Sequence, residues 1–389
     1  MKNNILTFPK NFYWGSSTSA HQVEGNNHND WTEWEKENAE RLAKEAKDKY
    51  QKWQVKKFPE MLRPKNYISG RACDHYNHYE EDFDIAKSLN HNAHRFSIEW
   101  SRIEPEEGKF DEKEIEHYRK VLKALKKRGL EPFVTLWHWP NPIWIRDNGG
   151  WGNKKTIEYF IRYVNKIADE LGNNIKFWIP INEPALYAAW SYITGYFPPQ
   201  RKNLFSAMLV MKNLISAHKK VYMLLHEKLG DSVEVGSTSL YHNYLPYNKY
   251  NPLDQIITKI IYYFGDVRTT NWAKNYGDFV GLNGYFTSIL KFSPWGGKYP
   301  LVDQRNPNTW VSDLGWYIYP EGIYHVLKDL KTRYDKPVYI TENGLADKDD
   351  KSRKKFIEKN LFWMHKAMSE GVDVKGYFHW SLLDNFEWD

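Results

Sequence analysis

Eight short apolar segments, separated by longer amphipathic ones, constrain the fold more than any other feature of this sequence. The short segments are rich in β-branched and aromatic residues, which is typical of parallel strands buried on both faces. They cover residues 12–16, 92–98, 131–137, 176–181, 233–240, 278–283, 337–341 and 374–380. Helical patterns lie between most of them, at residues 78–90, 112–128, 154–171, 204–228, 321–333 and 352–370.

Eight strands alternating with helices predict an α/β fold, a closed (β/α)₈ barrel, which often exceeds the usual length of one domain. We therefore expect residues 1–389 to form a single barrel domain. The alternative, a doubly wound sheet, needs a glycine-rich phosphate-binding turn after its first strand, and Trp14-Gly15-Ser16-Ser17 does not provide one. Because the chain stops at Asp389, just after the eighth strand and its loop, the predicted barrel lacks its eighth helix.

A long insertion follows the first predicted strand. Its apolar residues recur at helical spacing, and Glu40–Lys44 and Glu45–Lys49 are i,i+4 pairs in the favourable order. We expect one amphipathic helix over residues 30–53, packed over the rim of the barrel. Its apolar face would hold Trp31, Trp34, Leu42, Ala46, Tyr50 and Trp53.

Several function classes are excluded or disfavoured by composition. No apolar run approaches the ~20 residues that a membrane span needs. Residues 1–10 show no secretory signal, and the single cysteine, Cys73, cannot form an internal disulfide, so we expect a cytoplasmic protein. The net charge is +6, but no block of five or more like charges indicates nucleic-acid binding. Cys73 and His75 alone are a weak metal-binding pattern, and we expect no metal.

Polar and aromatic residues follow the C-terminal ends of the predicted strands, where (β/α)₈ barrels carry their active sites. The fourth strand leads to Asn182-Glu183-Pro184, and the seventh leads to Glu342-Asn343-Gly344. Two carboxylates across a pocket suit glycoside hydrolysis, in which one protonates the leaving oxygen while the other attacks the anomeric carbon or activates water. The 18 tryptophans also suit sugar binding, because apolar sugar faces lie against aromatic rings. We find no serine–histidine triad context, Walker loop or nicotinamide-binding fingerprint.

These motifs, taken in order, resemble glycoside hydrolase family 1 over nearly the whole chain. The two carboxylate motifs, Asn182-Glu183-Pro184 and Ile340-Thr341-Glu342-Asn343-Gly344, look like the two signatures of that family. The supporting segments are Phe12-Tyr13-Trp14-Gly15, Gln22-Val23-Glu24-Gly25, Cys73-Asp74-His75-Tyr76, Arg95-Phe96-Ser97-Ile98, Thr135-Leu136-Trp137-His138-Trp139, Asp278-Phe279-Val280-Gly281-Leu282-Asn283 and Trp380-Ser381-Leu382-Leu383-Asp384-Asn385-Phe386-Glu387-Trp388.

The resemblance implies a retaining β-glycosidase that needs no cofactor, with Glu183 as acid/base and Glu342 as nucleophile. It implies that Trp380 forms a platform beneath the non-reducing sugar. It also implies nucleophile support from Arg95, Asn283 and Tyr285, and hydrogen bonds to the sugar hydroxyls from Gln22, His138, Asn182, Glu387 and Trp388. The roles are physically consistent, because a cation and a hydroxyl keep a nucleophilic carboxylate ionised.

Glu387 also bears on the substrate, because in this family a glutamate here fits an unphosphorylated sugar and would repel a 6-phosphate. We therefore expect unphosphorylated β-glucosides or β-galactosides, as a small-molecule glycoside or an oligosaccharide. The alternative is a sugar-binding barrel with little or no turnover, since the segment after Asp389 is missing. A phosphate-binding barrel enzyme is a third reading, but the glycine-rich loop that it needs after strand seven or eight is absent.

Overall fold

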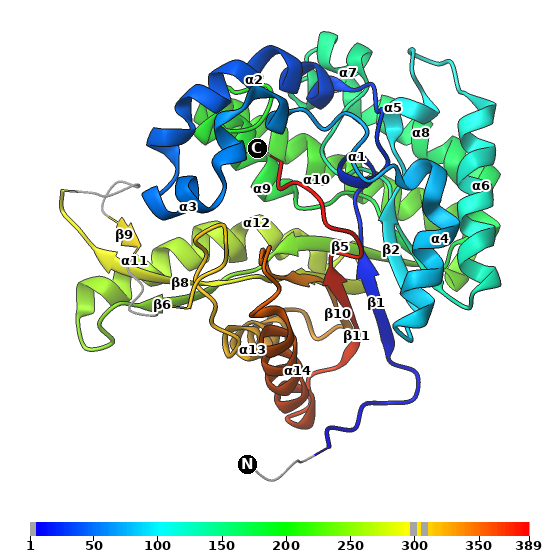
Figure 1. The fold of residues 1–389 in the computed structure, drawn as a ribbon. Coiled ribbons are helices and arrows are strands. Elements are labelled where there is room, and N and C mark those ends of the chain that lie inside the picture. The colour runs from blue at the N-terminus through cyan, green and yellow to red at the C-terminus, as the bar shows by residue number, and fades with distance from the viewer. Residues whose placement is uncertain (1–4, 296–301, 305–309, 389) are drawn as a thin grey trace. The chain divides into compact units, whose positions relative to one another are not determined.

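A computed structural model describes residues 5–295, 302–304 and 310–388. Eight parallel strands form a closed barrel in the order β1-β11-β10-β7-β5-β4-β3-β2 (Figure 1), which confirms the predicted fold class. Each strand overlaps one of the eight predicted segments. The strands are β1 (Tyr13–Ser17), β2 (Ala93–Ser97), β3 (Glu131–Thr135), β4 (Phe177–Ile179), β5 (Glu234–Leu240), β7 (Phe279–Asn283), β10 (Val338–Gly344) and β11 (Val374–Trp380).

The chain packs as two compact units. Unit 1 comprises Met1–Phe12, Ser239–Asn275 and Val280–Trp380, and unit 2 comprises Tyr13–Thr238, Tyr276–Phe279 and Ser381–Asp389. Residues 1–4, 296–301, 305–309 and 389 of the predicted 1–389 domain lie outside the described residues, and the single-domain assignment stays a prediction. From Ser381 to Trp388, where the described chain ends, no helix follows β11, as predicted.

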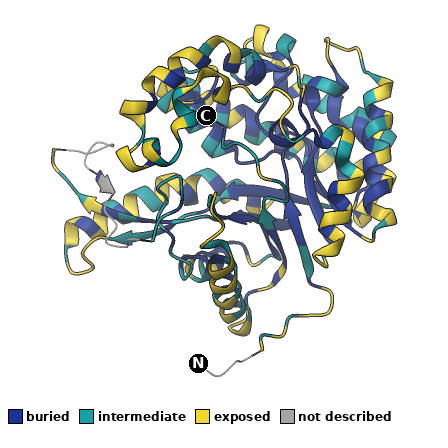
Figure 2. Cartoon of the chain, in the orientation of Figure 1, coloured by how far each residue is buried: buried dark blue, intermediate teal, exposed yellow. Residues whose placement is uncertain are grey.

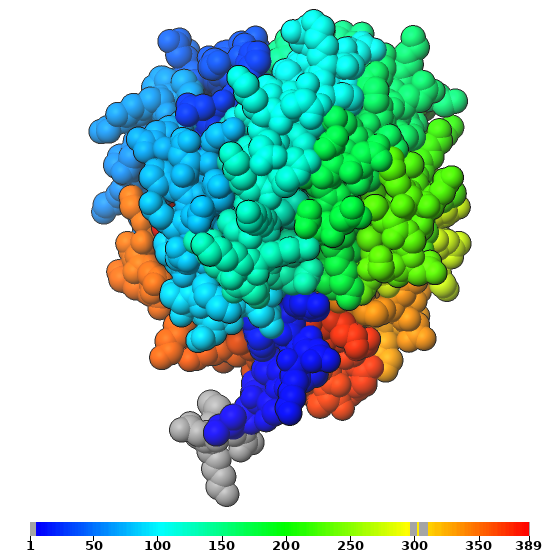
Figure 3. Space-filling view, turned by 90° about the vertical axis from the view of Figure 1, so that its right-hand side faces the viewer, coloured from blue at the N-terminus to red at the C-terminus, as the bar shows by residue number. Residues whose placement is uncertain are grey.

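Unit 2 carries a layer of long helices. They are α4 (His75–Ser88), α6 (Glu112–Lys127), α8 (Lys155–Leu171) and α10 (Leu204–Leu229). Neighbours in this series pack on one another, and Figure 3 shows them as adjoining bands from cyan to green. Figure 2 shows that exposed residues lie on their outer faces, while the strands are buried. Shorter helices are α1 (Ala20–Val23), α5 (Trp100–Ile103), α7 (Ile143–Asp147) and α9 (Pro184–Ala189), with 3₁₀ or π turns at Pro59–Leu62, Pro64–Tyr67, Gly150–Gly152, Gly172–Asn174, Trp190–Thr194 and Gly230–Ser232.

Local sequence explains where these helices begin. The Asp111 carboxylate caps α6 by accepting from the backbone nitrogens of Lys113 at 2.8 Å and Glu114 at 3.4 Å. Such a cap stabilises a helix by about 1 kcal/mol. Lys126 and Lys127 lie in the last turn, where positive charge favours the helix dipole.

The insertion forms two helices rather than the single predicted one. Helix α2 (Asp30–Lys49) starts at a capping box between Asn29 and Thr32 and buries Trp31, Trp34, Leu42 and Ala46. It ends at Lys49 because Tyr50 adopts an extended backbone, and α3 (Lys52–Lys57) begins afresh at a capping box of its own, between Gln51 and Gln54. The prediction of one helix over residues 30–53 was therefore wrong beyond Lys49, and Trp53 is 38% exposed.

Unit 1 contains the predicted helices α13 (Gly322–Tyr334) and α14 (Arg353–Ser369), which pack on one another. It also contains α11 (Pro252–Tyr262), a π turn at Tyr263–Val267, α12 (Arg268–Thr270) and a 3₁₀ turn at Asn271–Lys274. A small sheet in the order β6-β8-β9 was not predicted. Its strands are β6 (Asn243–Pro246), β8 (Thr287–Phe292) and β9 (Val302–Gln304). Among the described helices of the whole chain, none combines the length and apolar character needed to cross a bilayer.

Candidate active site

Glu183 lies at a sharp bend between β4 and α9. Its backbone is left-handed, with φ +45° and ψ 58°, which costs a residue other than glycine about 1–3 kcal/mol. The bend is held on both sides, because Asn182 donates its backbone nitrogen to Trp137 O at 3.0 Å and Glu183 donates its own to Thr238 O at 3.1 Å. The residue is only 4% exposed, so the fold holds a strained, buried carboxyl group here.

The side chain of Asn182 connects two other residues of unit 2. Its Oδ1 accepts from Nη2 of Arg95 at 2.7 Å, and its Nδ2 lies 3.1 Å from Nε2 of His138. Because a guanidinium only donates, Oδ1 must face Arg95, and Nδ2 then donates to Nε2 of His138. Burial, reinforced by the positive charge of Arg95, lowers the pKa of His138 well below its usual value. His138 is therefore a neutral imidazole with its proton on Nδ1.

Arg95 is buried on β2 and also donates from Nε to Thr135 Oγ1 at 3.2 Å. These contacts place the cation beside Asn182, the residue that precedes Glu183. The predicted support of the nucleophile by Arg95 stays a prediction.

Glu342 lies on β10 in unit 1 and is 4% exposed. The hydroxyl of Tyr285 donates to its Oε2 at 2.5 Å, within the range of a charge-assisted hydrogen bond. The backbone of Glu342 is also fixed, because its carbonyl accepts from the nitrogen of Gly284 at 2.9 Å. The structure thus places the Tyr285 hydroxyl on the Glu342 carboxylate, and the role of Tyr285 as nucleophile support stays a prediction.

Asn283 and Trp380 occupy the strands on either side of β10. Asn283 is opposite Glu342 in the β10–β7 register, and its Oδ1 accepts from Thr341 Oγ1 at 2.7 Å. Trp380 is the last residue of β11 and is opposite Gly344. A Cβ at Gly344 would lie 1.9 Å from the carbonyl oxygen of Trp380, so only glycine allows this approach of the strands. Both residues thus lie on strands adjacent to that of Glu342.

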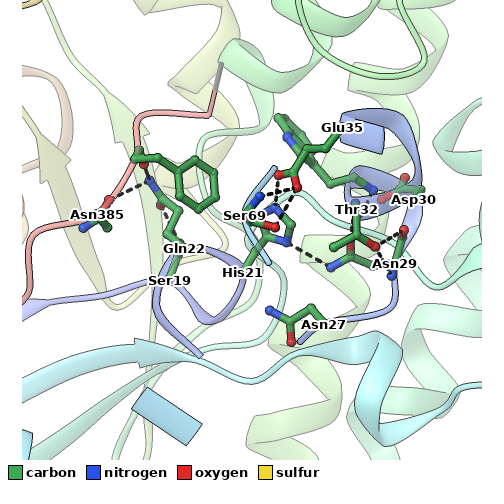
Figure 4. A network of polar contacts seen from close by, with 12 residues as sticks. Ser19, His21, Gln22, Asn27, Asn29, Asp30, Thr32, Glu35, Ser69 and Asn385 are labelled. Atoms are coloured by element: carbon green, nitrogen blue, oxygen red, sulfur yellow. Dashed lines mark hydrogen bonds and ion pairs between the residues drawn. The ribbon is translucent and has the colours of Figure 1, made fainter. Parts of the chain in front are cut away.

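Gln22 lies on α1 in unit 2 and is fully buried. Its Nε2 donates to Asn385 Oδ1 at 3.0 Å and to the carbonyl of Phe386 at 2.6 Å, and its Oε1 accepts from Ser19 at 2.5 Å (Figure 4). Gln22 therefore ties the segment that carries the partly buried Glu387 to α1. Its predicted contact with sugar stays a prediction.

Trp388 is enclosed by aromatic rings and is 4% exposed. Its ring centroid lies 4.6 Å from those of Trp31 and Trp139. It stacks with His138 at 5.9 Å and an interplanar angle of 19°. The structure thus brings Trp388 beside His138, whose ring is linked through Asn182 to Arg95.

The whole sequence matches one known family. The profile described as "Glycosyl hydrolase family 1" covers residues 5–263 and 265–389. The chain belongs to glycosyl hydrolase family 1. It is therefore a glycoside hydrolase on a (β/α)₈ barrel, as the motifs predicted.

Relatives within family 1 differ in their named substrates. β-Glucosidase A of Thermotoga maritima is 31% identical over 428 residues, covering 99% of this chain and 91% of that protein. A 6-phospho-β-galactosidase of Clostridium acetobutylicum is 29% identical, covering 98% of this chain and 90% of that protein.

Two solved structures of similar proteins also cover almost the whole chain. A β-glycosidase from Pyrococcus horikoshii has 35% identity and a TM-score of 0.84, covering 98% of this chain and 87% of that one. The Thermotoga maritima β-glucosidase in complex with glucoimidazole has 29% identity and a TM-score of 0.86, covering 99% and 91%.

Sequence reasoning missed some polar residues around this family 1 site. His21 and Glu35 are buried in unit 2 and joined by a 3.0 Å contact, although they are 14 residues apart. The sequence signal was faint, because His21 is next to Gln22 but Glu35 is one of many glutamates in the insertion. Trp139, to which the sequence motifs gave no role of its own, donates from Nε1 to the carbonyl of Asn182 at 3.2 Å and has a left-handed backbone with φ +86°.

Cys73 and His75 have separate partners. Cys73 Sγ donates to the carbonyl of Asp384 at 3.0 Å, and His75 Nδ1 lies 2.6 Å from Asp82. Within residues 5–295, 302–304 and 310–388, no group of three His, Cys, Asp or Glu side chains is placed to hold a metal ion.

Proposed function

We propose that this family 1 enzyme is a retaining β-glycosidase acting on unphosphorylated β-glucosides or β-galactosides, with Glu183 as acid/base and Glu342 as nucleophile. The observation that carries the proposal is the state of Glu342, a buried carboxylate in the family's second motif that accepts a 2.5 Å hydrogen bond from Tyr285. In a retaining mechanism the carboxylate is the form that attacks the anomeric carbon.

In the first step, the Glu342 carboxylate attacks the anomeric carbon as the glycosidic C–O bond breaks. Glu183 gives its proton to the departing oxygen, so that a neutral alcohol leaves. The product is a covalent ester between the sugar and Glu342. Glu342 loses its negative charge when the ester forms, and Glu183, having given up its proton, is left as a carboxylate that can act as the base of the second step.

In the second step, Glu183 takes a proton from water, and the water oxygen attacks the anomeric carbon. The ester bond breaks and Glu342 leaves as a carboxylate, to which the Tyr285 hydroxyl again donates. Two inversions at one carbon give overall retention, which requires carboxyl groups about 5 Å apart.

For the sugar, we propose hydrogen bonds from Gln22, His138, Asn182, Glu387 and Trp388, a platform at Trp380, and nucleophile support from Arg95 and Asn283. The neutral state of His138 supports its part, because Nε2 accepts from Asn182 while Nδ1 carries the proton and is a hydrogen-bond donor. A small-molecule glycoside is thus the proposed partner, and the chemistry needs only carboxylates. The cytoplasmic location stays a prediction.

The preference for unphosphorylated sugar rests on Glu387. Relatives include both β-glucosidases and a 6-phospho-β-galactosidase, so membership of the family does not decide this point. An anionic side chain near the sugar 6-position would repel a phosphate dianion. The ratio of kcat/KM for nitrophenyl β-glucoside over its 6-phosphate should exceed 100 in the parent and fall at least tenfold in Glu387→Gln. A parent enzyme that prefers the phosphorylated sugar would contradict this assignment.

The proposed chemistry is tested by nitrophenol release from aryl β-glucoside and β-galactoside. We expect turnover in the parent, and a loss of at least 10³-fold in Glu342→Gly that azide restores as the α-glycosyl azide. Glu37→Gln, a change at an exposed glutamate of α2, is the matched control and should turn over like the parent. A folded parent that binds sugar without turnover would instead support the non-catalytic alternative.

A further inference from the structure

A polar cluster in unit 2, buried at His21, Asn29 and Glu35 and partly buried at Ser69, has no part in the proposed chemistry. It consists of His21 on α1, Asn29 and Glu35 at the start of α2, and Ser69, which follows the 3₁₀ turn Pro64–Tyr67 (Figure 4). His21 and Glu35 have side-chain exposures of 1% and 3%. Burying a polar pair at this depth costs free energy unless every donor meets an acceptor. We therefore expect each polar atom of the pair to have a hydrogen-bond partner.

The orientation of Asn29 fixes the position of the proton on His21. Oδ1 of Asn29 caps α2 by accepting from the backbone nitrogens of Trp31 at 3.1 Å and Thr32 at 2.9 Å. Its Nδ2 must therefore be the atom that lies 3.2 Å from Nδ1 of His21. Since Nδ2 only donates, Nδ1 accepts, and the imidazole carries its proton on Nε2.

Glu35 receives that proton's hydrogen bond and two others. Its Oε1 lies 3.0 Å from Nε2 of His21, and its Oε2 accepts from the backbone nitrogen of Ser69 at 2.8 Å and from its hydroxyl at 2.6 Å. All three partners donate, and only a carboxylate can accept from them on both oxygens. An amide at position 35 would set one N–H group against a donor.

The orientation of the His21 ring sets its contact with Trp388, and His21 also adjoins Gln22 in sequence. His21 stacks on Trp388 at 5.6 Å with an interplanar angle of only 9°, and it precedes Gln22 on the same short helix. Trp388 and Gln22 are two of the residues to which the proposed function gives sugar contacts. Helix α2 is thus linked to both of them through one imidazole ring.

We propose that Glu35 is a positioning residue, which fixes the proton and the plane of His21 and so holds Trp388 and Gln22 in place for sugar binding. The inference rests on the proposed function only for the statement that these two residues contact sugar. Loss of a positioning contact weakens binding in the ground state and the transition state alike, so it raises KM and leaves kcat nearly unchanged. A merely structural role would lower the fraction of folded enzyme and hence the apparent kcat.

The test compares Glu35→Gln with Glu37→Gln, an identical change at an exposed position of the same helix. The dissociation constant of deoxynojirimycin, measured by calorimetry, needs no turnover, and KM for an aryl glucoside is measured beside it. We expect both constants to rise about tenfold in Glu35→Gln, equivalent to ~1.4 kcal/mol, and to stay within twofold of the parent in Glu37→Gln. Unchanged constants in a folded Glu35→Gln variant would overturn the proposal.

Two further measurements keep the test decisive. His21→Phe retains a ring against Trp388 but loses both hydrogen bonds of the imidazole. If the two residues act as one unit, the double variant His21→Phe/Glu35→Gln should bind deoxynojirimycin no more weakly than whichever single variant binds it less tightly. Independent additive losses would overturn the coupling. In ¹⁵N spectra of the parent, the His21 ring, identified by its absence from His21→Phe, should carry its proton on Nε2, and a proton on Nδ1 would refute the geometry. A parent that binds the iminosugar without hydrolysing glycosides would disprove the proposed function but not this role of Glu35.

Discussion

Replacing Tyr285 with phenylalanine removes one hydroxyl and tests what its hydrogen bond does for Glu342. The Oη···Oε2 distance of 2.5 Å marks a charge-assisted bond, for which a typical net value is about 1.5–3 kcal/mol. The bond is strongest when Glu342 is a free carboxylate. Tyr285 is only partly buried, so we take the lower half of the range, about 1.5–2 kcal/mol.

The two steps respond differently to this loss. In the first step, Glu342 gives up its charge, so a weaker hold on the carboxylate does not slow the attack. In the second step, Glu342 departs as a carboxylate, and its departure loses the help of the hydroxyl. A loss of about 1.5–2 kcal/mol slows this step roughly 10- to 30-fold. We therefore expect kcat and KM to fall together, while kcat/KM changes less than about threefold.

The assay is rapid-quench or stopped-flow release of nitrophenol from an aryl β-glucoside. Tyr285→Phe should show a burst close to one equivalent of nitrophenol per enzyme, followed by slow turnover. The matched control is Tyr324→Phe, which removes a 2.8 Å bond from a tyrosine to the carboxylate of Glu370 at an exposed site of the same unit, and it should behave like the parent. A fall in kcat/KM with no burst would contradict this prediction, because the hydroxyl would then act on the first step.

Other predictions concern stability. Burial raises the pKa of Asp30 to about 7, so the native state binds this proton up to near-neutral pH while the unfolded chain has released it by about pH 4. The stability that the protonated carboxyl supplies is thus lost as pH rises from about 4 to about 7. Asp30→Asn has no such group, so its midpoint of urea unfolding should fall less steeply with rising pH across that range than the midpoint of the parent. Equal slopes would contradict a raised pKa. Gly344→Ala places a Cβ against the Trp380 carbonyl, so it should cost about 1–3 kcal/mol in a thermal or urea unfolding experiment, and an unchanged midpoint would show that the strands move apart freely. Trp31→Ala removes a fully buried side chain from the rings around Trp388 and should cost about 3–5 kcal/mol, whereas Trp53→Ala, at an exposed position, should cost less than about 1 kcal/mol.

The barrel and the motifs were predictable from sequence because their signals are local. A buried parallel strand such as β4 is a short apolar run in the sequence, and all three of its residues are buried. The motif around Glu342 ends such a strand, so its place at the end of β10 follows from the pattern alone. Tyr285 was expected near Glu342 from the family resemblance and because a hydroxyl donor suits a nucleophilic carboxylate.

Other features depend on partners distant in sequence. The small sheet pairs β6 with β8, and Asn243 with Thr287, across 44 residues, and no single segment reveals that pairing. The break in the insertion at Tyr50 is invisible to helical periodicity, because the apolar spacing continues through it. The role of Glu35 depends on the orientation of Asn29, which only the cap of α2 determines.

In the proposed mechanism, Glu342 forms a covalent bond with the sugar. Incubation with 2,4-dinitrophenyl 2-deoxy-2-fluoro-β-glucoside, followed by mass spectrometry of the intact protein and of its peptides, tests this directly. We predict one fluoroglucosyl group per chain, on the peptide that contains Glu342, and none in Glu342→Gln. A label on another residue, or an active enzyme that forms no adduct and yields the inverted sugar, would contradict a covalent intermediate on Glu342.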